Sequence, residues 1–261
     1  MTRTAISPRL AIRIFFSTVV YLAPVDAAQK NQRVPWNLNS VPETGSTNAD
    51  LLAQGAAGAP DRTVLRADHQ TAGRGRLDRS WEAPPRGNLL VSFLFRDIPS
   101  DPHVLTQAVA IAAARVARDC GSHAVLKWPN DLLVGTQKLA GVLAQAGPLS
   151  DGRPAFVVVG IGVNIADAPA GAVSVASSGG TVIDPQDFLE RMLPHVDAML
   201  SLPAQEMHAT YREELATIGV AVRVELPDGT TVTGRATDVE ADGRLVVLDE
   251  CAISHRFDTA D

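Results

Sequence analysis

The fold is indicated most clearly by one stretch near the middle of the chain, Lys127-Trp128-Pro129-Asn130-Asp131-Leu132-Leu133-Val134-Gly135-Thr136-Gln137-Lys138-Leu139-Ala140-Gly141. Apolar runs on both sides of its turn residues predict three strands, over residues 124–128, 132–134 and 138–146. Because proline cannot donate a hydrogen bond to a sheet, the first strand should turn at Pro129. Gly135-Thr136-Gln137 then predicts a hairpin between the second and third strands.

The charged residues of this stretch gather at the ends of the predicted strands. In such a hairpin Lys127 and Lys138 reach the same neighbourhood, and Asn130 and Asp131 lie where the first strand ends. The spacing alone leaves two interpretations open. These residues form a binding site, or they lie on a surface hairpin where Asp131 pairs with either lysine and has no catalytic role.

Before this stretch the sequence predicts two helices and two strands. Residues 46–55 read as a short helix, since Thr47 followed by Asp50 resembles a capping arrangement and Gly55 is a helix stop. A longer helix rich in Ala and Val is expected over residues 101–120. The strands should flank a polar, Gly/Arg-rich loop, with the strands at 62–67 and 88–96 and the loop at 68–87.

After this stretch the predicted secondary structure changes twice. The expected elements are a strand at 154–165, a loop at 166–180 and helices at 185–200 and 204–216. Short alternating strands separated by Asp-Gly turns follow, at 222–226, 230–238 and 244–248, and predict a small β-barrel or sandwich. The predicted fold class is therefore α/β (α+β), a mixed domain with a β appendage.

Two glycine-containing motifs are candidates for ligand binding. In Gln70-Thr71-Ala72-Gly73-Arg74-Gly75-Arg76 the glycines allow close backbone approach and the arginines offer forked donors to an anion. Such a loop also fits a solvated turn or a nonspecific anion site. Gly160-Ile161-Gly162-Val163-Asn164-Ile165 is no dinucleotide fingerprint, because Ile165 stands where a third glycine should be. It reads equally as a buried strand whose glycines allow close packing.

Composition excludes several other classes of function. The net charge of −6 lacks the basic footprint of a nucleic-acid-binding protein. Cys120 and Cys251 are far apart and have no metal-ligand spacing, so a disulfide framework and a structural zinc site are not expected. The chain contains neither a Walker phosphate loop nor a G-x-S-x-G elbow, which argues against common nucleotide hydrolases and α/β-hydrolases.

Five blocks, taken in order and spacing, resemble the biotin–protein ligase family: residues 43–48, 70–76, 127–131, 138–141 and 160–165. The resemblance covers residues 41–166 and implies a mixed sheet flanked by helices, like the catalytic core of class II aminoacyl-tRNA synthetases. It also implies an SH3-like C-terminal barrel. The implied domains are an N-terminal segment of uncertain structure, a catalytic domain and this barrel, at residues 1–40, 41–216 and 217–261.

The resemblance also implies a role for each site residue. Those expected to bind biotin are Ser46, Thr47, Asn48, Gln70, Arg74, Gly75, Arg76 and Lys138. Those expected on the nucleotide side are Trp81, Lys127, Asn130, Asp131 and Asn164, with Mg²⁺ carried by ATP and lying near Asp131. Lys138 and Arg76 are the catalytic candidates, and the loop at 68–87 would close over the intermediate.

The implied activity is ATP-dependent biotinylation of a biotin carboxyl carrier protein, such as that of acetyl-CoA carboxylase. Two alternatives stay open: a lipoate– or octanoyl–protein ligase of the same superfamily, and a noncatalytic biotin-sensing regulator. Residues 1–40 show no helix-turn-helix, so the resemblance is to the monofunctional type. No nucleic acid, no membrane and a monomer or weak homodimer are expected. After Arg76, Leu77-Asp78-Arg79 departs from the more basic family pattern.

Both ends of the chain carry a further expectation. Arg3, Arg9 and Arg13 precede an apolar run at 14–23 that imitates a signal peptide, yet the run is shorter than the about 20 residues that span a bilayer. We expect a cytoplasmic protein, because the implied chemistry consumes ATP, with an exported binding protein as the alternative. At the other end, the chain is expected to stop before the last strand of the family's C-terminal domain.

Overall fold

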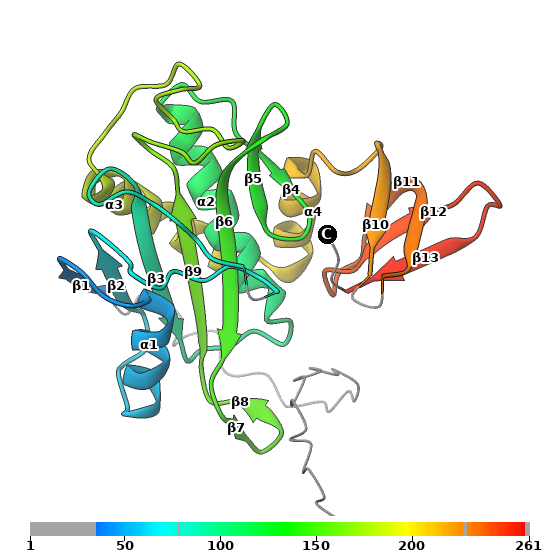
Figure 1. Ribbon diagram of the computed structural model, residues 1–261. Helices are drawn as coiled ribbons and strands as arrows, with labels where there is room; N and C mark the ends of the chain where they lie inside the picture. Colours follow the sequence, from blue (N-terminus) through cyan, green and yellow to red (C-terminus); the bar gives the residue numbers. More distant parts are fainter. Residues whose placement is uncertain (1–34, 78, 227–228, 259–261) are drawn as a thin grey trace, which may run out of the picture. The chain divides into compact units, whose positions relative to one another are not determined.

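The computed structural model describes residues 35–77, 79–226 and 229–258 (Figure 1). The first half of this region forms β1 (Asn37–Val41), α1 (Thr47–Ala56), β2 (Thr63–Ala67), β3 (Leu89–Phe95), α2 (His103–Asp119), β4 (Val125–Lys127), β5 (Asp131–Val134) and β6 (Gln137–Ala146). The second half forms β7 (Leu149–Ser150), β8 (Arg153–Pro154), β9 (Val157–Val163), α3 (Pro185–Leu200), α4 (Ala204–Glu214), β10 (Ala221–Glu225), β11 (Thr231–Val239), β12 (Leu245–Leu248) and β13 (Ser254–Phe257). Among the helices described, none combines the length and the hydropathy that a bilayer crossing needs.

The main sheet is mixed and has seven strands in the order β1-β2-β3-β9-β6-β5-β4. β1 runs parallel to β2, and the other neighbours are antiparallel. The central strands β3 and β9 are buried along their whole length. The predicted α/β class and the hairpin at Gly135 are confirmed, and Gly135 takes the left-handed φ of 60° that such a turn favours.

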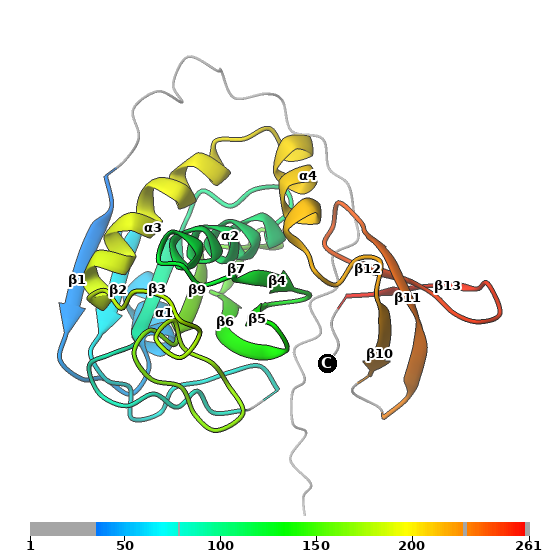
Figure 2. The same cartoon turned by 90° about the horizontal axis from the view of Figure 1, so that it is seen from above.

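Helices cover the two faces of this sheet unequally. On one face, β9 packs against the alanine-rich helix α2 and β3 packs against α3, and the two helices lie side by side in Figure 2. On the other face, α1 packs through Leu51 against Leu65, Leu94 and Val158. Side chains of a strand alternate between faces, so Gly160 and Gly162 point to the α1 face with Val158. This face is covered by a short helix alone, which leaves room for a cavity.

A second, antiparallel sheet has the strand order β10-β11-β12-β13. Its buried residues include Val224, Ala236, Val247 and Phe257. We call residues 217–258 the C-terminal domain. By their contacts, residues 34–261 form one compact unit, which holds both this domain and the main sheet.

Three local predictions need correction. The sequence did not predict β1 or β13, although the predicted strands 222–226, 230–238 and 244–248 are confirmed as β10, β11 and β12. β13 pairs with β12, and the expectation that the chain stops before the family's last strand stays a prediction. Helix α1 is capped by Ser46, whose hydroxyl accepts from the Ala49 N–H, one residue earlier than expected.

The domain boundaries at 40/41 and 216/217 stay predictions. β1 begins at Asn37, so the sheet includes residues of the segment whose structure was left uncertain. The signal-like run at 14–23 lies outside the described residues.

Candidate functional site

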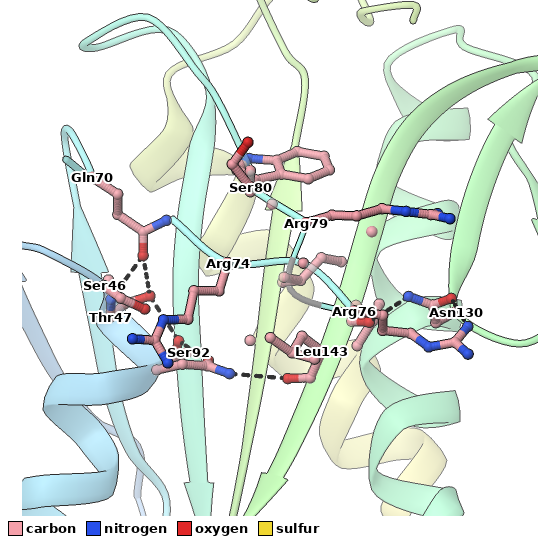
Figure 3. Close-up of a pocket in the computed structure, with 18 of the residues that line it drawn as sticks. Ser46, Thr47, Gln70, Arg74, Arg76, Arg79, Ser80, Ser92, Asn130 and Leu143 are labelled. Atoms are coloured by element: carbon pink, nitrogen blue, oxygen red, sulfur yellow. Dashed lines mark hydrogen bonds between the residues drawn. The ribbon is translucent and has the colours of Figure 1, made fainter. Parts of the chain in front are cut away.

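An open cavity of ≈ 760 Å³, counted with the solvent at its mouth, lies on the α1 face of the main sheet. Its floor is made by β3, β9, β6 and β5, and the loop between β2 and β3 covers it (Figure 3). The residues that line it and were predicted as site residues are Ser46, Thr47, Asn48, Gln70, Arg74, Gly75, Arg76, Trp81, Asn130, Asp131 and Lys138. Three segments far apart in sequence thus meet around one space.

One end of the cavity is lined by a chain of polar side chains. The Gln70 Oε1 accepts from the Thr47 backbone N–H and hydroxyl at 2.7 and 2.9 Å. The Thr47 and Ser92 hydroxyl oxygens are 2.7 Å apart, and Ser92 donates to the Asn48 Oδ1 at 2.6 Å. The Asn48 amide group in turn donates to the Leu143 carbonyl and to Gln145 at 3.1 and 2.9 Å.

This polar chain has more acceptor oxygens than hydrogens to share. The two hydroxyls supply one hydrogen each. They make three contacts, to Gln70, to Asn48 and to each other, so one of the three contacts lacks a hydrogen. An N–H group of a ligand can supply what is missing, so this end is complementary to a donor.

Glycines of β9 create the space that the polar chain and the loop occupy. A Cβ on Gly160 would lie 2.1 Å from the Asn48 Oδ1, and one on Gly162 would lie 2.3 Å from the Trp81 ring. The interpretation of residues 160–165 as a buried strand with close-packing glycines is therefore confirmed. Gly162 pairs with Gly141 of β6, whose own Cβ would meet Lys138 and Trp81.

The covering loop is folded on itself. The Trp81 N–H donates to the Gly73 carbonyl at 3.0 Å, and the Gly75 N–H donates to the Arg79 carbonyl at 2.7 Å. The backbones of Arg74 and Ser80 form an isolated antiparallel β-bridge. A Cβ on Gly73 would lie 2.4 Å from the Trp81 carbonyl oxygen, so glycine is required there. Residues 73–77 and 79–81 therefore pair as a small hairpin over the cavity.

Arg76 and Lys138 lie at the other end of the cavity, whereas Figure 3 shows the Arg74 side chain turned toward Thr47 and Ser92. The Arg76 guanidinium donates to the Asn130 Oδ1 at 2.9 Å, as Figure 3 shows, so the loop contacts the turn between β4 and β5. The Lys138 Nζ lies 2.7 Å from the Asp131 Oδ1 and 5.7 Å from the centre of the Trp81 ring. The predicted convergence of Arg76 and Lys138 on one cavity is thus observed, and Asp131 pairs with Lys138.

Two predicted site residues lie elsewhere. Lys127 is exposed and lines a groove between the turns of the main sheet and β10. Asn164 is buried below the cavity, where its amide group donates to the carbonyls of Lys138 and Val173 at 3.4 and 3.2 Å. This geometry gives Asn164 a supporting position under Lys138, and nucleotide contacts by these two residues stay predictions.

Several residues of the cavity were not predicted: Arg79, Ser80, Val91, Ser92, Val142 and Leu143. Gly141, Gly160, Ile161 and Gly162 belonged to the predicted motifs but had no assigned role. Ser92 had a signal in the sequence, because it is the one polar residue in the apolar run of β3. A fully buried hydroxyl needs a partner, so a serine in such a strand indicates a polar feature beside it.

The cavity offers little for a resident metal ion. Within the described part of the chain, no group of three or more His, Cys, Asp or Glu side chains could hold one. Asp131 is the single carboxylate among the lining residues. A divalent cation would therefore have to bring most of its ligands with it.

Two segments of the chain match models of known protein families. Residues 42–164 match the Biotin/lipoate A/B protein ligase family, and residues 217–250 match the Biotin protein ligase C terminal domain. The first match contains every predicted site residue. The second coincides with the four-stranded sheet up to the turn before β13.

Among curated proteins, a biotin–[acetyl-CoA-carboxylase] ligase of Mycobacterium tuberculosis is 39% identical over 229 residues, which cover 80% of this chain and 82% of that one. One from Paracoccus denitrificans is 37% identical over 167 residues, covering 58% and 68%. Among solved structures, a biotin protein ligase from Aquifex aeolicus in complex with biotin and ATP has a TM-score of 0.71 at 24% identity, covering 85% of this chain and 96% of that one. At that identity the structural likeness bears on the fold alone.

Proposed function

This chain belongs to the biotin protein ligase family, and from that premise we propose how the cavity works: it joins biotin to AMP and passes the biotin to a lysine of a carboxylase's carrier protein. The observation that carries the proposal is the meeting of Arg76 and Lys138 at one end of a cavity whose other end is rich in acceptors. Such a cavity suits a ligand with N–H groups at one end and an anion at the other.

The acceptor-rich end would hold the ureido ring of biotin. Its two N–H groups would donate to the oxygens of Gln70, Thr47, Ser92 and Asn48, which share too few hydrogens among themselves. Lipoyl and octanoyl groups have no N–H, so they would leave those buried oxygens without a donor. An unpaired buried polar group costs about 1–3 kcal/mol, which favours biotin over the other acids of the superfamily.

The cationic end would carry the first half-reaction. A carboxylate oxygen of biotin attacks the α-phosphorus of ATP, a new O–P bond forms, and pyrophosphate leaves with the electrons of the broken bond. Two anions must approach each other for this to happen. Lys138, Arg76 and the backbone N–H groups of the loop would offset their repulsion where water is scarce.

Mg²⁺ would accompany ATP into this end. Asp131 offers one carboxylate, and Mg²⁺ sites with one or two carboxylates plus substrate phosphates are common. When bound, Mg²⁺ would draw negative charge from the phosphate oxygens. Asp131 would then exchange part of its pairing with Lys138 for the cation, and Lys138 would turn toward the phosphate.

The covering hairpin would protect the intermediate. Biotinyl-adenylate is a mixed anhydride that water destroys, so it must be shielded until the carrier arrives. The hairpin of residues 73–77 and 79–81 would close the cavity, with Trp81 over Lys138 and Arg76 against Asn130. The carrier lysine then attacks the acyl carbon, and AMP leaves. Holding both groups in place supplies much of the rate acceleration.

The direct test is ligation by the purified full-length chain. With biotin, MgATP and a biotin carboxyl carrier domain, we expect the carrier to gain one biotinyl group in its mass spectrum. A carrier whose acceptor lysine is changed to Arg should gain nothing. Lipoate and octanoate, supplied in place of biotin, separate the alternatives. Transfer of either acid in preference to biotin would overturn the assignment.

A further inference from the structure

Trp128 is fixed by two hydrogen bonds from the C-terminal domain. Its backbone N–H donates to the Thr217 hydroxyl at 2.9 Å, and its indole N–H donates to the Gly243 carbonyl at 2.8 Å. The side chain is 6% exposed. Both acceptors come from the segment that matches the C-terminal domain family, about 90 to 115 residues later in the chain.

The Gly243 carbonyl is itself held in place. Gly243 lies in the turn between β11 and β12, which is closed by hydrogen bonds from Gly243 to Glu240 and from Glu240 to Arg244. Its φ is +87°, and a Cβ there would lie 3.1 Å from the His103 ring at the start of α2. The turn is thus seated on the main domain, and the acceptor that it offers to Trp128 has a defined position.

Trp128 is also joined to the cationic end of the cavity. Pro129 follows it, and the next two residues are Asn130, which binds Arg76 of the loop, and Asp131, which pairs with Lys138. Asn130 is locked to β6 by reciprocal hydrogen bonds with Val142, at 2.8 and 2.9 Å. The position of the turn between β4 and β5 therefore affects the positions of the Arg76 and Lys138 side chains.

We propose that Trp128 is a positioning residue through which the C-terminal domain sets the geometry of the nucleotide end of the site. The proposal rests on the proposed function, and it adds a role for the C-terminal domain in the first half-reaction. A shift of the turn moves Asn130 and Asp131 together, and with them the partners of Arg76 and Lys138. The polar chain of the biotin end bonds to α1, β3 and β6, and none of its hydrogen bonds given above goes to this turn, so the biotin end should respond less.

The test compares three substitutions in the full-length chain. Trp128→Phe keeps an aromatic ring, although a smaller one, and removes the indole donor. Thr217→Val keeps the shape and removes the hydroxyl acceptor. Thr217→Ser keeps the hydroxyl acceptor and should therefore keep the wild-type rate that Thr217→Val loses. Arg212→Met is the matched control, because the Arg212–Asp238 ion pair at 2.5 Å also joins α4 to the C-terminal domain but does not touch the turn.

We expect Trp128→Phe and Thr217→Val to lower the rate of biotin-dependent pyrophosphate release about tenfold and to raise the KM for MgATP, since a small misplacement at a reacting centre is costly. The KM for biotin should stay within about twofold, as expected when the lost hydrogen bond acts at the other end. Thr217→Ser and Arg212→Met should keep wild-type constants even where the melting temperature falls. A smaller amount of folded enzyme would not change the KM for MgATP.

The proposal fails if Thr217→Val keeps wild-type constants, or if Arg212→Met loses as much as Trp128→Phe. It also fails if the KM for biotin rises as much as that for MgATP. If Trp128→Phe does not fold, the result for Thr217→Val alone decides the test. Wild-type ligation, measured in parallel, tests the proposed function separately.

Amide hydrogen exchange without ligands gives an answer that does not depend on ligation. Peptides covering residues 126–134 should exchange faster in Thr217→Val than in the wild type, and not in Arg212→Met. Unchanged exchange of these peptides in Thr217→Val would overturn the coupling.

Discussion

Lys138 illustrates how one side chain can have a structural partner and a chemical role at once. It lies 2.7 Å from Asp131, and its side chain is 40% exposed at the edge of the cavity. An ion pair this accessible contributes about 0–1 kcal/mol to stability. Its replacement should therefore leave the fold intact and act on the chemistry.

We predict that Lys138→Ala lowers biotin-dependent pyrophosphate release about 10²–10³-fold, or about 3 kcal/mol, as for other preorganised donors to a developing charge. Lys138→Arg should recover part of this loss. Arg153→Ala, which removes an exposed cation from the β7–β8 hairpin, is the control. Near-normal release by a folded Lys138→Ala enzyme would remove this residue from the mechanism.

Two glycines of β9 permit a pair of substitutions with different effects. Gly162→Ala places a methyl group on the Trp81 ring, and Gly160→Ala places one on the Asn48 amide. We predict that Gly162→Ala mainly impairs adenylate formation, by about 10²-fold because Trp81 and the hairpin are displaced. Gly160→Ala should mainly raise the KM for biotin. Steady-state constants for both substrates distinguish the two, and identical effects would contradict the division of the cavity.

Among the elements, the covering hairpin has the clearest functional consequence. It is joined to the main sheet by the contact between Arg76 and Asn130. We predict that Arg76→Gly still forms biotinyl-adenylate but releases it early, because the hairpin no longer closes against the β4–β5 turn. Rapid filtration after a single turnover would measure the retained intermediate. Retention equal to that of the wild type would mean that Arg76 does not hold the hairpin closed.

The stability that the turn between β12 and β13 gives to the fold should decrease at acid pH. Hydrogen bonds from His255 and from the Ile253 and Cys251 N–H groups hold the pKa of Asp249 below its usual value. The folded state thus binds this proton less readily than the unfolded chain. The stabilisation is therefore present above the unfolded pKa of about 3.9 and is lost as the pH falls through the lower, folded value.

We predict that Asp249→Asn lowers the melting temperature at pH 7, and that the difference from the wild type shrinks as the pH is taken below about 4. Scanning calorimetry over a pH series measures this difference. A difference that stays constant across the series would show that Asp249 stabilises the turn without its charge.

The elements that could be predicted are those with a strong period of their own. The alanine-rich α2 and the helix α3 were predicted almost to their ends, since burial of one face imposes a helical pattern. β1 was missed because Asn37, Asn39 and Ser40 are polar residues of an edge strand. β13 was missed because its four residues, SHRF, bury little besides Phe257.

At the scale of the whole molecule, the cavity residues that lie in sequence motifs were predicted, whereas most of the strand residues that line the cavity were not. Each predicted segment carried an unusual residue, such as the arginines of the loop or the lysines of the hairpin, so the cavity could be anticipated. Ser92 was overlooked, although it is the one polar residue in the apolar run of β3. The hydrogen bond from Trp128 to Gly243 joins residues 115 apart, and nothing in the intervening sequence indicates it.

The net charge of −6 leads to a prediction about the remaining alternative, a regulator that binds DNA. Binding to phosphates requires clustered cations, and a chain with an excess of carboxylates lacks that driving force. We expect no retardation of duplex DNA in a mobility-shift assay at physiological salt, with or without biotin and ATP. Salt-dependent retardation by the purified chain would reopen that alternative.

The pairing of Lys138 with Asp131 has a consequence for what the enzyme does to itself. A free amine near an activated acyl group attacks its carbonyl carbon, and the chain has three lysines, at positions 30, 127 and 138, against twenty arginines. Of the two that the structure describes, Lys138 is held by its ion pair with Asp131, and Lys127 lies outside the cavity. Self-modification should therefore be slow, and the acyl group stays available for a lysine that comes from another protein.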